Sequence, residues 1–112
     1  MDYSYLVLAH PKDEREADWE IWHRRHVREV LQIPGFVSCR RFRVTDPQPS
    51  GRQPDWRFMV LYELSTDDIA GCLKEMRRRI DDGRIAMTDA SNPNRTVTLV
   101  WEQLSAHGPP SS

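Results

Sequence analysis

The chain has 112 residues, enough for one domain but not for a second hydrophobic core. Hydrophobic residues make up 38% and charged residues 29%, which suits a soluble globular protein and argues against a disordered one. The formal charge is −1, from 16 basic and 17 acidic residues, so the positive excess typical of nucleic-acid binders is missing. The one basic cluster, Arg77 to Arg79, is followed by Asp81 and Asp82 and is typical of a solvated helix end.

The N-terminal sequence and the cysteines bear on location. Met1-Asp2-Tyr3 is followed by neither a basic segment nor a long apolar run, so we expect a cytoplasmic protein without signal peptide or membrane contact. Cys39 and Cys72 have no metal-ligand spacing. Either one disulfide or two free thiols fits this pair, and free thiols are favoured in a reducing cytoplasm.

The first half of the chain predicts a strand, a helix and a second strand. Residues 3–9 are aromatic and aliphatic and form a strand that ends at His10-Pro11. A charged stretch then opens a helix from about Glu14 to Gln32, which must stop before Pro34-Gly35. Phe36 to Thr45 is expected to be the second strand.

The second half repeats this pattern after an exposed connection over Asp46 to Asp55, which holds three prolines and a glycine. Apolar residues alternate through Trp56 to Leu64, which predicts a third strand. Ser65 to Asp68 supplies an N-cap for a second helix that ends near Asp82-Gly83. A loop leads to the last strand, Thr96 to Leu104, whose first half is rich in β-branched residues.

The resulting order, β-α-β-β-α-β, is the split βαβ arrangement of a ferredoxin-like α+β fold with an antiparallel sheet. We expect one domain over residues 1–105 and a disordered tail over 106–112, where Gly108-Pro109-Pro110 disfavours regular structure. Two helices cover only one face of the sheet, so the other face needs a partner, and a second copy is the simplest one. The sequence therefore predicts a homodimer. Its interface would use one of two alternating sets: Phe58, Val60 and Tyr62, or Met59 and Leu61.

The first helix carries the most informative side chains. At about 100° per residue, its apolar side holds Trp19, Trp22, His23, His26, Val27, Val30 and Ile33. Its other side holds Arg24, Arg25, Arg28 and Gln32. A histidine in an apolar pocket stays neutral near pH 7 and can accept a proton, and tryptophans can form flat ligand-binding walls. The alternative is that both histidines are hydrogen-bonded core residues, which helical spacing alone favours.

Side chains on the predicted strands are placed to complete such a pocket: Tyr5, Tyr62, Arg41 and Trp101. Adjacent strand residues point to opposite faces, so Arg40 should face away from Arg41. One of them could hold a carboxylate or enolate, whereas a rim or salt-bridge role is favoured for each one taken singly. Trp101 fits a core position as well as a ligand wall. His23 and His26 supply two metal ligands at most, and no nucleotide-binding fingerprint is present, so we expect neither metal nor cofactor. Haem bound through one histidine has no other support in the sequence.

The pattern Trp19-x-x-Trp22-His23-x-x-His26, followed by Ile33-Pro34-Gly35-Phe36 and Arg41-Phe42, resembles the EthD-like branch of the dimeric α/β-barrel superfamily. The element order over residues 3–104 also matches. The resemblance implies a cleft between helices and sheet, with His, Tyr, Trp or Arg at the ligand. Relatives include polyketide cyclases, lactone isomerases, cofactor-free monooxygenases, haem-dependent enzymes and proteins without an assigned activity.

These observations lead to a small enzyme doing general acid–base chemistry on an aromatic or polyketide-like substrate, as a cyclase, isomerase or lyase. His26 is the expected base, with His23 or Tyr62 assisting. Substrate would contact Trp19, Trp22, Arg41, Tyr5 and Trp101. A non-catalytic ligand-binding or accessory protein is the alternative, and a cofactor-free monooxygenase would need no different motif.

Overall fold

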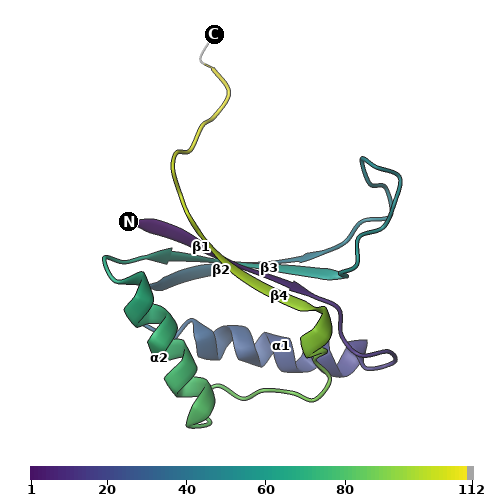
Figure 1. The fold of residues 1–112 in the computed structure, drawn as a ribbon, viewed down its shortest axis with the longest axis horizontal. Helices are drawn as coiled ribbons and strands as arrows, with labels where there is room; N and C mark the ends of the chain where they lie inside the picture. Colours follow the sequence, from purple (N-terminus) through teal and green to yellow (C-terminus); the bar gives the residue numbers. More distant parts are fainter. Residues whose placement is uncertain (111–112) are drawn as a thin grey trace.

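The structure, a computed structural model, describes residues 1–110 and has the predicted element order (Figure 1). The strands are β1 (Asp2–Ala9), β2 (Phe36–Arg43), β3 (Phe58–Ser65) and β4 (Thr96–Glu102). The helices are α1 (Glu16–Val30) and α2 (Ile69–Asp81), and a short 3-10 helix, η1 (Pro93–Arg95), precedes β4. The strands form one antiparallel sheet in the order β2-β3-β1-β4.

Local chemistry explains where the helices begin and end. Glu14 has a φ of 64°, outside the helical region, so α1 starts two residues later than its acidic stretch suggested. Gly35, with a φ of 99°, turns the chain from α1 into β2, as the Pro-Gly pair predicted. Asp68 caps α2 by accepting a hydrogen bond from the Gly71 amide at 2.9 Å.

The hydrophobic core lies between the sheet and the two helices, which cover the same face (Figure 1). On the central strand β3, the buried side chains are Phe58, Val60, Tyr62 and Leu64. Because these residues already pack in the monomer, the first of the two interface sets predicted from sequence is wrong. Met59 and Leu61 alternate with them and point to the other face.

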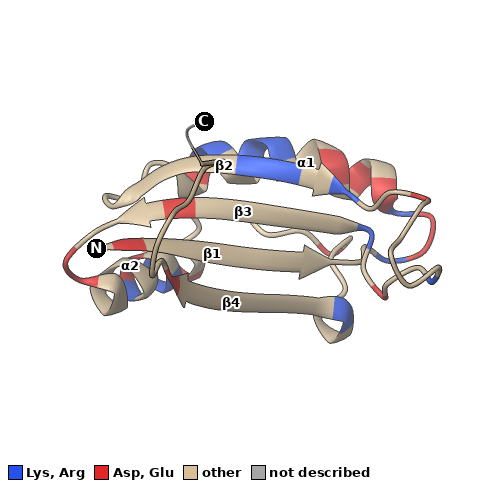
Figure 2. Ribbon diagram, turned by 90° about the horizontal axis from the view of Figure 1, so that it is seen from above, with Lys and Arg blue, Asp and Glu red and all other residues tan. Residues whose placement is uncertain are grey.

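We call the sheet surface away from the helices the open face. The strand pairing places these apolar residues on it: Leu6 and Leu8 of β1, Phe42 of β2, Met59 and Leu61 of β3, and Val97, Leu99 and Trp101 of β4. Figure 2 is viewed from this side. Leu99 and Trp101 are 44% and 56% exposed, although large apolar side chains normally find cover.

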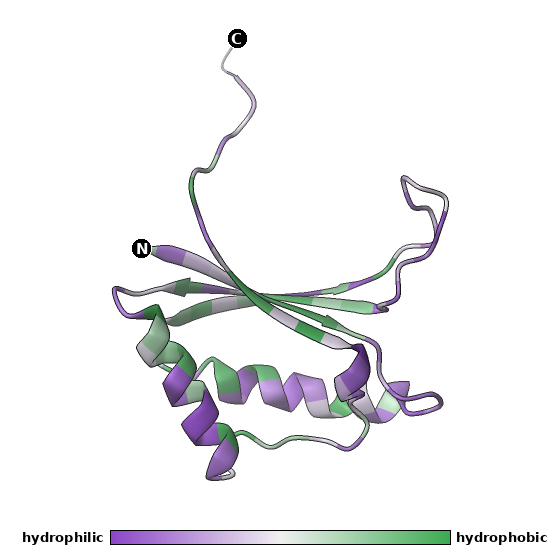
Figure 3. Cartoon of the chain, viewed as in Figure 1, coloured by the Kyte–Doolittle hydropathy of each residue, from purple (hydrophilic) through white to green (hydrophobic). Residues whose placement is uncertain are grey.

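Two segments extend beyond the sheet on the side of the open face (Figures 1 and 3). The connection of residues 44–57 rises at one end of the strands, and the chain after β4 rises at the other. Residues 106–110 of the predicted tail are exposed and have no regular secondary structure, and residues 111–112 lie outside the described part. Within residues 1–110, no helix is both long and apolar enough to span a membrane.

Candidate functional site

The aromatic stripe of α1 is packed against the sheet. Trp19 is 3% exposed, and its ring stacks on the His23 ring at a centroid distance of 4.5 Å and on the Phe58 ring at 4.8 Å. Both faces of the indole are therefore occupied by protein rings. Trp19 was predicted to contact substrate, but its contacts are those of a core residue.

His23 is held by an arginine from β2. Its Nδ1 accepts a hydrogen bond from Arg41 Nε at 2.9 Å, and Arg41 Nη2 donates to Glu20 Oε1. Burial, the Arg41 charge and the nearby His26 together lower the pKa of His23 to about 3. His23 is thus neutral near pH 7, and its Nδ1 already accepts the hydrogen bond from Arg41. Arg40 faces away, as the strand alternation predicted, and pairs with Glu63 at 3.3 Å.

This depressed pKa makes the stability of the protein depend on pH. The unfolded chain protonates His23 below its ordinary value of 6.5, whereas the folded chain does so only near 3. The contribution of His23 to the free energy of unfolding is therefore fully present above pH 6.5. It is lost as the pH drops toward 3, by up to about 1.4 kcal/mol for each pH unit. The pKa of His26 is also lowered by burial, so both histidines act in the same direction.

The prediction can be checked by urea unfolding between pH 7 and pH 4.5, above the range in which Asp82 and Asp89 titrate. His23→Gln keeps an acceptor for Arg41 but cannot titrate, so its stability should change less with pH than that of the wild type. His107→Gln, in the exposed tail, is the matched control. Parallel pH profiles for wild type and His23→Gln would contradict the assignment.

His26 differs from His23 because one of its nitrogens has no partner. Its ring lies 4.4 Å from the Trp22 ring, and Trp22 Nε1 donates to the Ala86 carbonyl at 2.7 Å. Burial lowers the pKa of His26, while a hydrogen bond to the Ala86 backbone and the Glu29 carboxylate oppose this. Nδ1 is buried and makes no hydrogen bond with residues 1–110. His26 therefore presents a neutral ring with an unused nitrogen.

Ala86 belongs to the segment that links α2 to η1, and α1 holds it by two hydrogen bonds. Besides the bond from Trp22, the Ala86 amide donates to Glu29 Oε1 at 3.0 Å. Trp22, another predicted substrate contact, is half-buried and uses its only donor in this link. Its contacts are with Ala86 and with the rings of Trp19, His23 and His26.

Tyr62 lies at the centre of the core, 1% exposed. Its ring makes edge-to-face contacts with Tyr5 at 6.0 Å and Phe36 at 5.8 Å. Burial, followed by the neighbouring Cys39 thiol, raises the pKa of Tyr62, so its hydroxyl stays protonated. That hydroxyl is buried with the Cys39 thiol as its polar neighbour, and it makes no well-formed hydrogen bond with the described residues. Tyr62 and His26 thus each bring an unused polar atom to the buried layer between helices and sheet.

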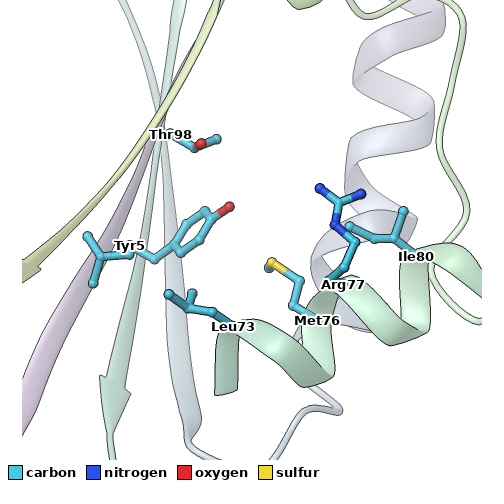
Figure 4. Close-up of a pocket in the computed structure, with 7 residues that line it drawn as sticks. Tyr5, Leu73, Met76, Arg77, Ile80 and Thr98 are labelled. Carbon is cyan, nitrogen blue, oxygen red and sulfur yellow. The ribbon is translucent and has the colours of Figure 1, made fainter. Parts of the chain in front are cut away.

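A pocket of about 330 Å³ opens between α2 and strands β1 and β4 (Figure 4). Its lining consists of Tyr5, Leu73, Met76, Arg77, Ile80, Thr98 and Val100. The Tyr5 hydroxyl and the Arg77 guanidinium point into the same space. Burial raises the pKa of Tyr5, while a hydrogen bond with Thr98 and the Arg77 charge oppose this. Tyr5 was predicted as a substrate contact and does line a pocket.

Arg77 is the pocket residue that the sequence did not single out. Its guanidinium lies 3.7 Å from the Asp81 carboxylate and its side chain is 70% exposed, so it stands at the pocket mouth. Arg77 is the first of three consecutive arginines, and nothing in the sequence distinguishes it from Arg78 and Arg79. Of these three, only Arg77 lines the pocket. His23 and His26 are not lining residues of this pocket, although the sequence placed substrate against them.

Trp101 lies on the other side of the sheet. It pairs with Ser4 of β1, faces away from the helices and is 56% exposed. It cannot share a helix-side pocket with Tyr5, because strand alternation places the two on opposite faces. Within residues 1–110, no group of three or more His, Cys, Asp or Glu side chains is arranged to hold a metal ion. Cys39 and Cys72 are free thiols.

No family model and no curated protein matches the sequence. Solved structures do match it. An ethyl tert-butyl ether degradation (EthD) family protein from Bacillus halodurans is 18% identical, with a TM-score of 0.63 over 93% of this chain and 100% of that one. A dimeric ferredoxin-like protein of unknown function from Jannaschia is 16% identical, with a TM-score of 0.57 over 92% and 100%.

A third match is SnoaB, a cofactor-independent oxygenase from Streptomyces nogalater, 14% identical with a TM-score of 0.56 over 94% of this chain and 93% of that one. At these identities the similarity concerns the fold. It confirms, at that level, the resemblance that the Trp-His helix and the Pro-Gly-Phe turn indicated. The chain has the ferredoxin-like fold of EthD-like, dimeric α/β-barrel proteins.

Proposed function

We propose that the protein is a homodimeric enzyme that catalyses proton transfer on an aromatic or polyketide-like molecule bound between the helices and the sheet. It would act as a cyclase, isomerase or lyase without a cofactor. The observation that carries this proposal is the neutral His26 ring, whose buried Nδ1 has no hydrogen-bond partner among residues 1–110. A buried histidine of this kind is suited to remove a proton near pH 7.

The pocket beside α2 supplies the binding half of the proposal. Leu73, Met76 and Ile80 give it apolar walls, whereas Tyr5 and Arg77 give it a proton donor and a permanent positive charge. This combination suits a flat molecule with one oxygen that becomes negative during the reaction. The Tyr5 ring, which lines the pocket, packs edge-to-face on the ring of Tyr62, which does not line it.

His26 does not line this pocket, so the proposed step requires the ligand to extend beyond the lining residues to the His26 ring. Nδ1 of His26 then takes a proton from the carbon next to a ketone of the substrate. The electron pair of that C–H bond forms an enolate, whose oxygen is stabilised by Arg77 and the Tyr5 hydroxyl. In an isomerisation, protonated His26 returns the proton to another carbon. In a cyclisation, the enolate carbon attacks a second carbonyl, whose oxygen takes the proton.

Assistance at this step is better assigned to Tyr62 than to His23. The Nδ1 of His23 already accepts from Arg41, and the ring is packed on Trp19. We therefore infer that His23 and Arg41 position α1 against β2, whereas the buried hydroxyl of Tyr62 would assist only a ligand that extends beyond the pocket lining into the core.

A cofactor-independent oxygenase is the second candidate, favoured by the similarity of the fold to SnoaB. The same proton removal would give an electron-rich carbanion, which would react with O2 instead of a proton or carbonyl. The two functions differ in one measurable quantity, the oxygen consumed for each proton removed.

The test uses 1-tetralone, an aromatic ketone with exchangeable protons beside its carbonyl, in D2O under nitrogen. We expect deuterium incorporation, followed by NMR, to exceed the buffer rate. Arg77→Gln should lower the rate at least about tenfold, because a charged donor to the enolate oxygen is lost. Arg78→Gln, on the next residue of α2 and outside the pocket lining, should leave it unchanged.

Each alternative gives a different result. If oxygen is consumed when air replaces nitrogen, the oxygenase is favoured. If 1-tetralone binds to wild type but not to Arg77→Gln, and neither exchanges its protons, the pocket belongs to a binding protein and the catalytic proposal is wrong.

A further inference from the structure

A second cavity, the hairpin groove, lies at the end of the sheet beneath the connection of residues 44–57. It has a volume of about 500 Å³, and its main apolar lining residues are Leu8, Phe42, Val44, Pro54, Trp56 and Met59. Leu8, Phe42 and Met59 also belong to the open face, so groove and open face are one continuous apolar surface. The helix-side pocket shares no residue with it.

The C-terminal tail, which we define here as residues 103–110, is an exposed segment without charged side chains. Gln103 makes the last backbone hydrogen bond to the sheet, to the Asp2 carbonyl at 2.9 Å, and the chain then rises away from the molecule (Figure 1). Residues 103–110 contain no Asp, Glu, Lys or Arg, and all are exposed. Leu104 is 92% exposed, and the segment continues to Pro109 and Pro110. Burial of the Leu104 side chain against an apolar surface would therefore stabilise the tail.

We propose that the hairpin groove of one protomer binds the C-terminal tail of a second copy. This inference rests on the homodimer in the proposed function and adds a reciprocal exchange of tails at its two ends. The tail and the connection of residues 44–57, which borders the groove, extend on the same side of the sheet but at opposite ends of the strands (Figures 1 and 2). A two-fold axis that runs across the strands, between two facing sheets, brings each tail to the groove of the other copy.

Distance favours the partner's groove over the chain's own. An extended tail of eight residues spans about 25 Å, close to the length of an eight-residue strand. To reach its own groove, the tail would have to lie along the whole open face, which the dimer would cover. Facing sheets are about 10 Å apart, so the tail can cross to the partner with residues to spare.

The chemistry of the two surfaces is also matched. Proline-rich segments adopt an extended left-handed helix and bind in grooves lined by aromatic side chains, as Trp56 and Phe42 provide here. The tail carries no Lys or Arg, so it brings no like charge against Arg43 and Arg57 at the groove.

The test mixes two variants of the full chain, Leu104→Cys and Gln48→Cys, under a mild oxidant. Both variants and the control also carry Cys39→Ser and Cys72→Ala, so that each chain has a single cysteine. Gln48 lines the groove. Because each variant carries only one of the two new cysteines, a disulfide that joins residues 48 and 104 can form only between chains. We expect a covalent dimer that reducing agent separates. Mixing Leu104→Cys with Gln32→Cys, an exposed residue just after α1, controls for random collisions and should give at least tenfold less product.

Truncation after Gln103 gives a second readout, because it removes the tail beyond Gln103 and keeps the Gln103 hydrogen bond to the Asp2 carbonyl. It should raise the dimer dissociation constant at least tenfold, and Trp56→Ala should do the same without a further effect in the truncated chain. A dimer that survives with no specific cross-link and no response to truncation overturns the tail exchange but leaves the proposed function intact. A wild-type chain that is monomeric at micromolar concentration overturns both the exchange and the homodimer.

Discussion

Replacing His26 by alanine is expected to lower the rate of proton exchange from 1-tetralone by about a hundredfold or more, because the general base is removed. The fold should survive. Nδ1 of His26 has no partner to lose within residues 1–110, and the Ala86 carbonyl keeps the hydrogen bond from Trp22. We therefore expect a loss of unfolding free energy of no more than about 1–3 kcal/mol.

The two other histidine variants separate catalysis from stability. His23→Ala removes the acceptor of a buried arginine hydrogen bond, so it should lower the melting temperature more and the exchange rate per folded molecule less than His26→Ala. His107→Ala, in the exposed tail, should change neither. If His26→Ala melts several degrees lower and keeps its activity per folded molecule, the residue is structural and the assignment is wrong.

The pH profile adds an independent check. Burial lowers the pKa of His26 from its ordinary 6.5, so the base is already neutral at pH 7. The exchange rate should therefore be flat around pH 7 and should fall only when the pH drops below 6.5. A rate that rises steeply between pH 7 and pH 9 would point to a different base.

Periodicity made most of the fold predictable. An apolar residue at every second or every third to fourth position fixes which side of a strand or helix faces the core, and the buried Trp19, His23 and Val30 follow that rule. The Pro-Gly pair and the Asp68 cap marked the ends of elements, because their effects are local. The order of elements then allowed few topologies.

The candidate site was less predictable, because a pattern gives the face of a residue but not the residue across from it. His23 and His26 share one stripe, yet Arg41 from β2 occupies the first while the second keeps a free nitrogen. The pocket at Tyr5 depends on how α2 is placed against β4, which no local signal specifies. Arg77 was therefore predicted as part of a solvated helix end.

The alternation of β3 left two interface sets open, and burial decides between them. Tyr62 and Val60 are each 1% exposed beneath the helices, so Met59 and Leu61 remain on the open face. Sequence could not choose, because both sets are apolar and a central strand is covered on both sides once a partner is present. This choice supports the homodimer that we propose.

Leu61→Asp is expected to convert the homodimer into a monomer, with the sedimentation mass falling from twice the chain mass to 13.2 kDa. Leu61 lies on the central strand β3, opposite Leu6 of β1, so a partner sheet would bury it at the middle of the interface. A carboxylate there would be buried in the dimer beside its cross-strand neighbour Arg40, and the cost of removing both charges from water can exceed the gain from pairing them, whereas in a monomer both stay in contact with water.

Two further variants keep this test sound if Leu61→Asp folds poorly. Leu99→Lys changes the edge strand β4, where the side chain is 44% exposed, so the monomer should tolerate it while the dimer should not. Ile21→Asp makes the same kind of change on the solvent side of α1, where Ile21 is 71% exposed, and should leave the dimer intact. Circular dichroism would show that each variant is folded. A dimer that persists in both Leu61→Asp and Leu99→Lys would mean that the two copies meet through some surface other than the open face.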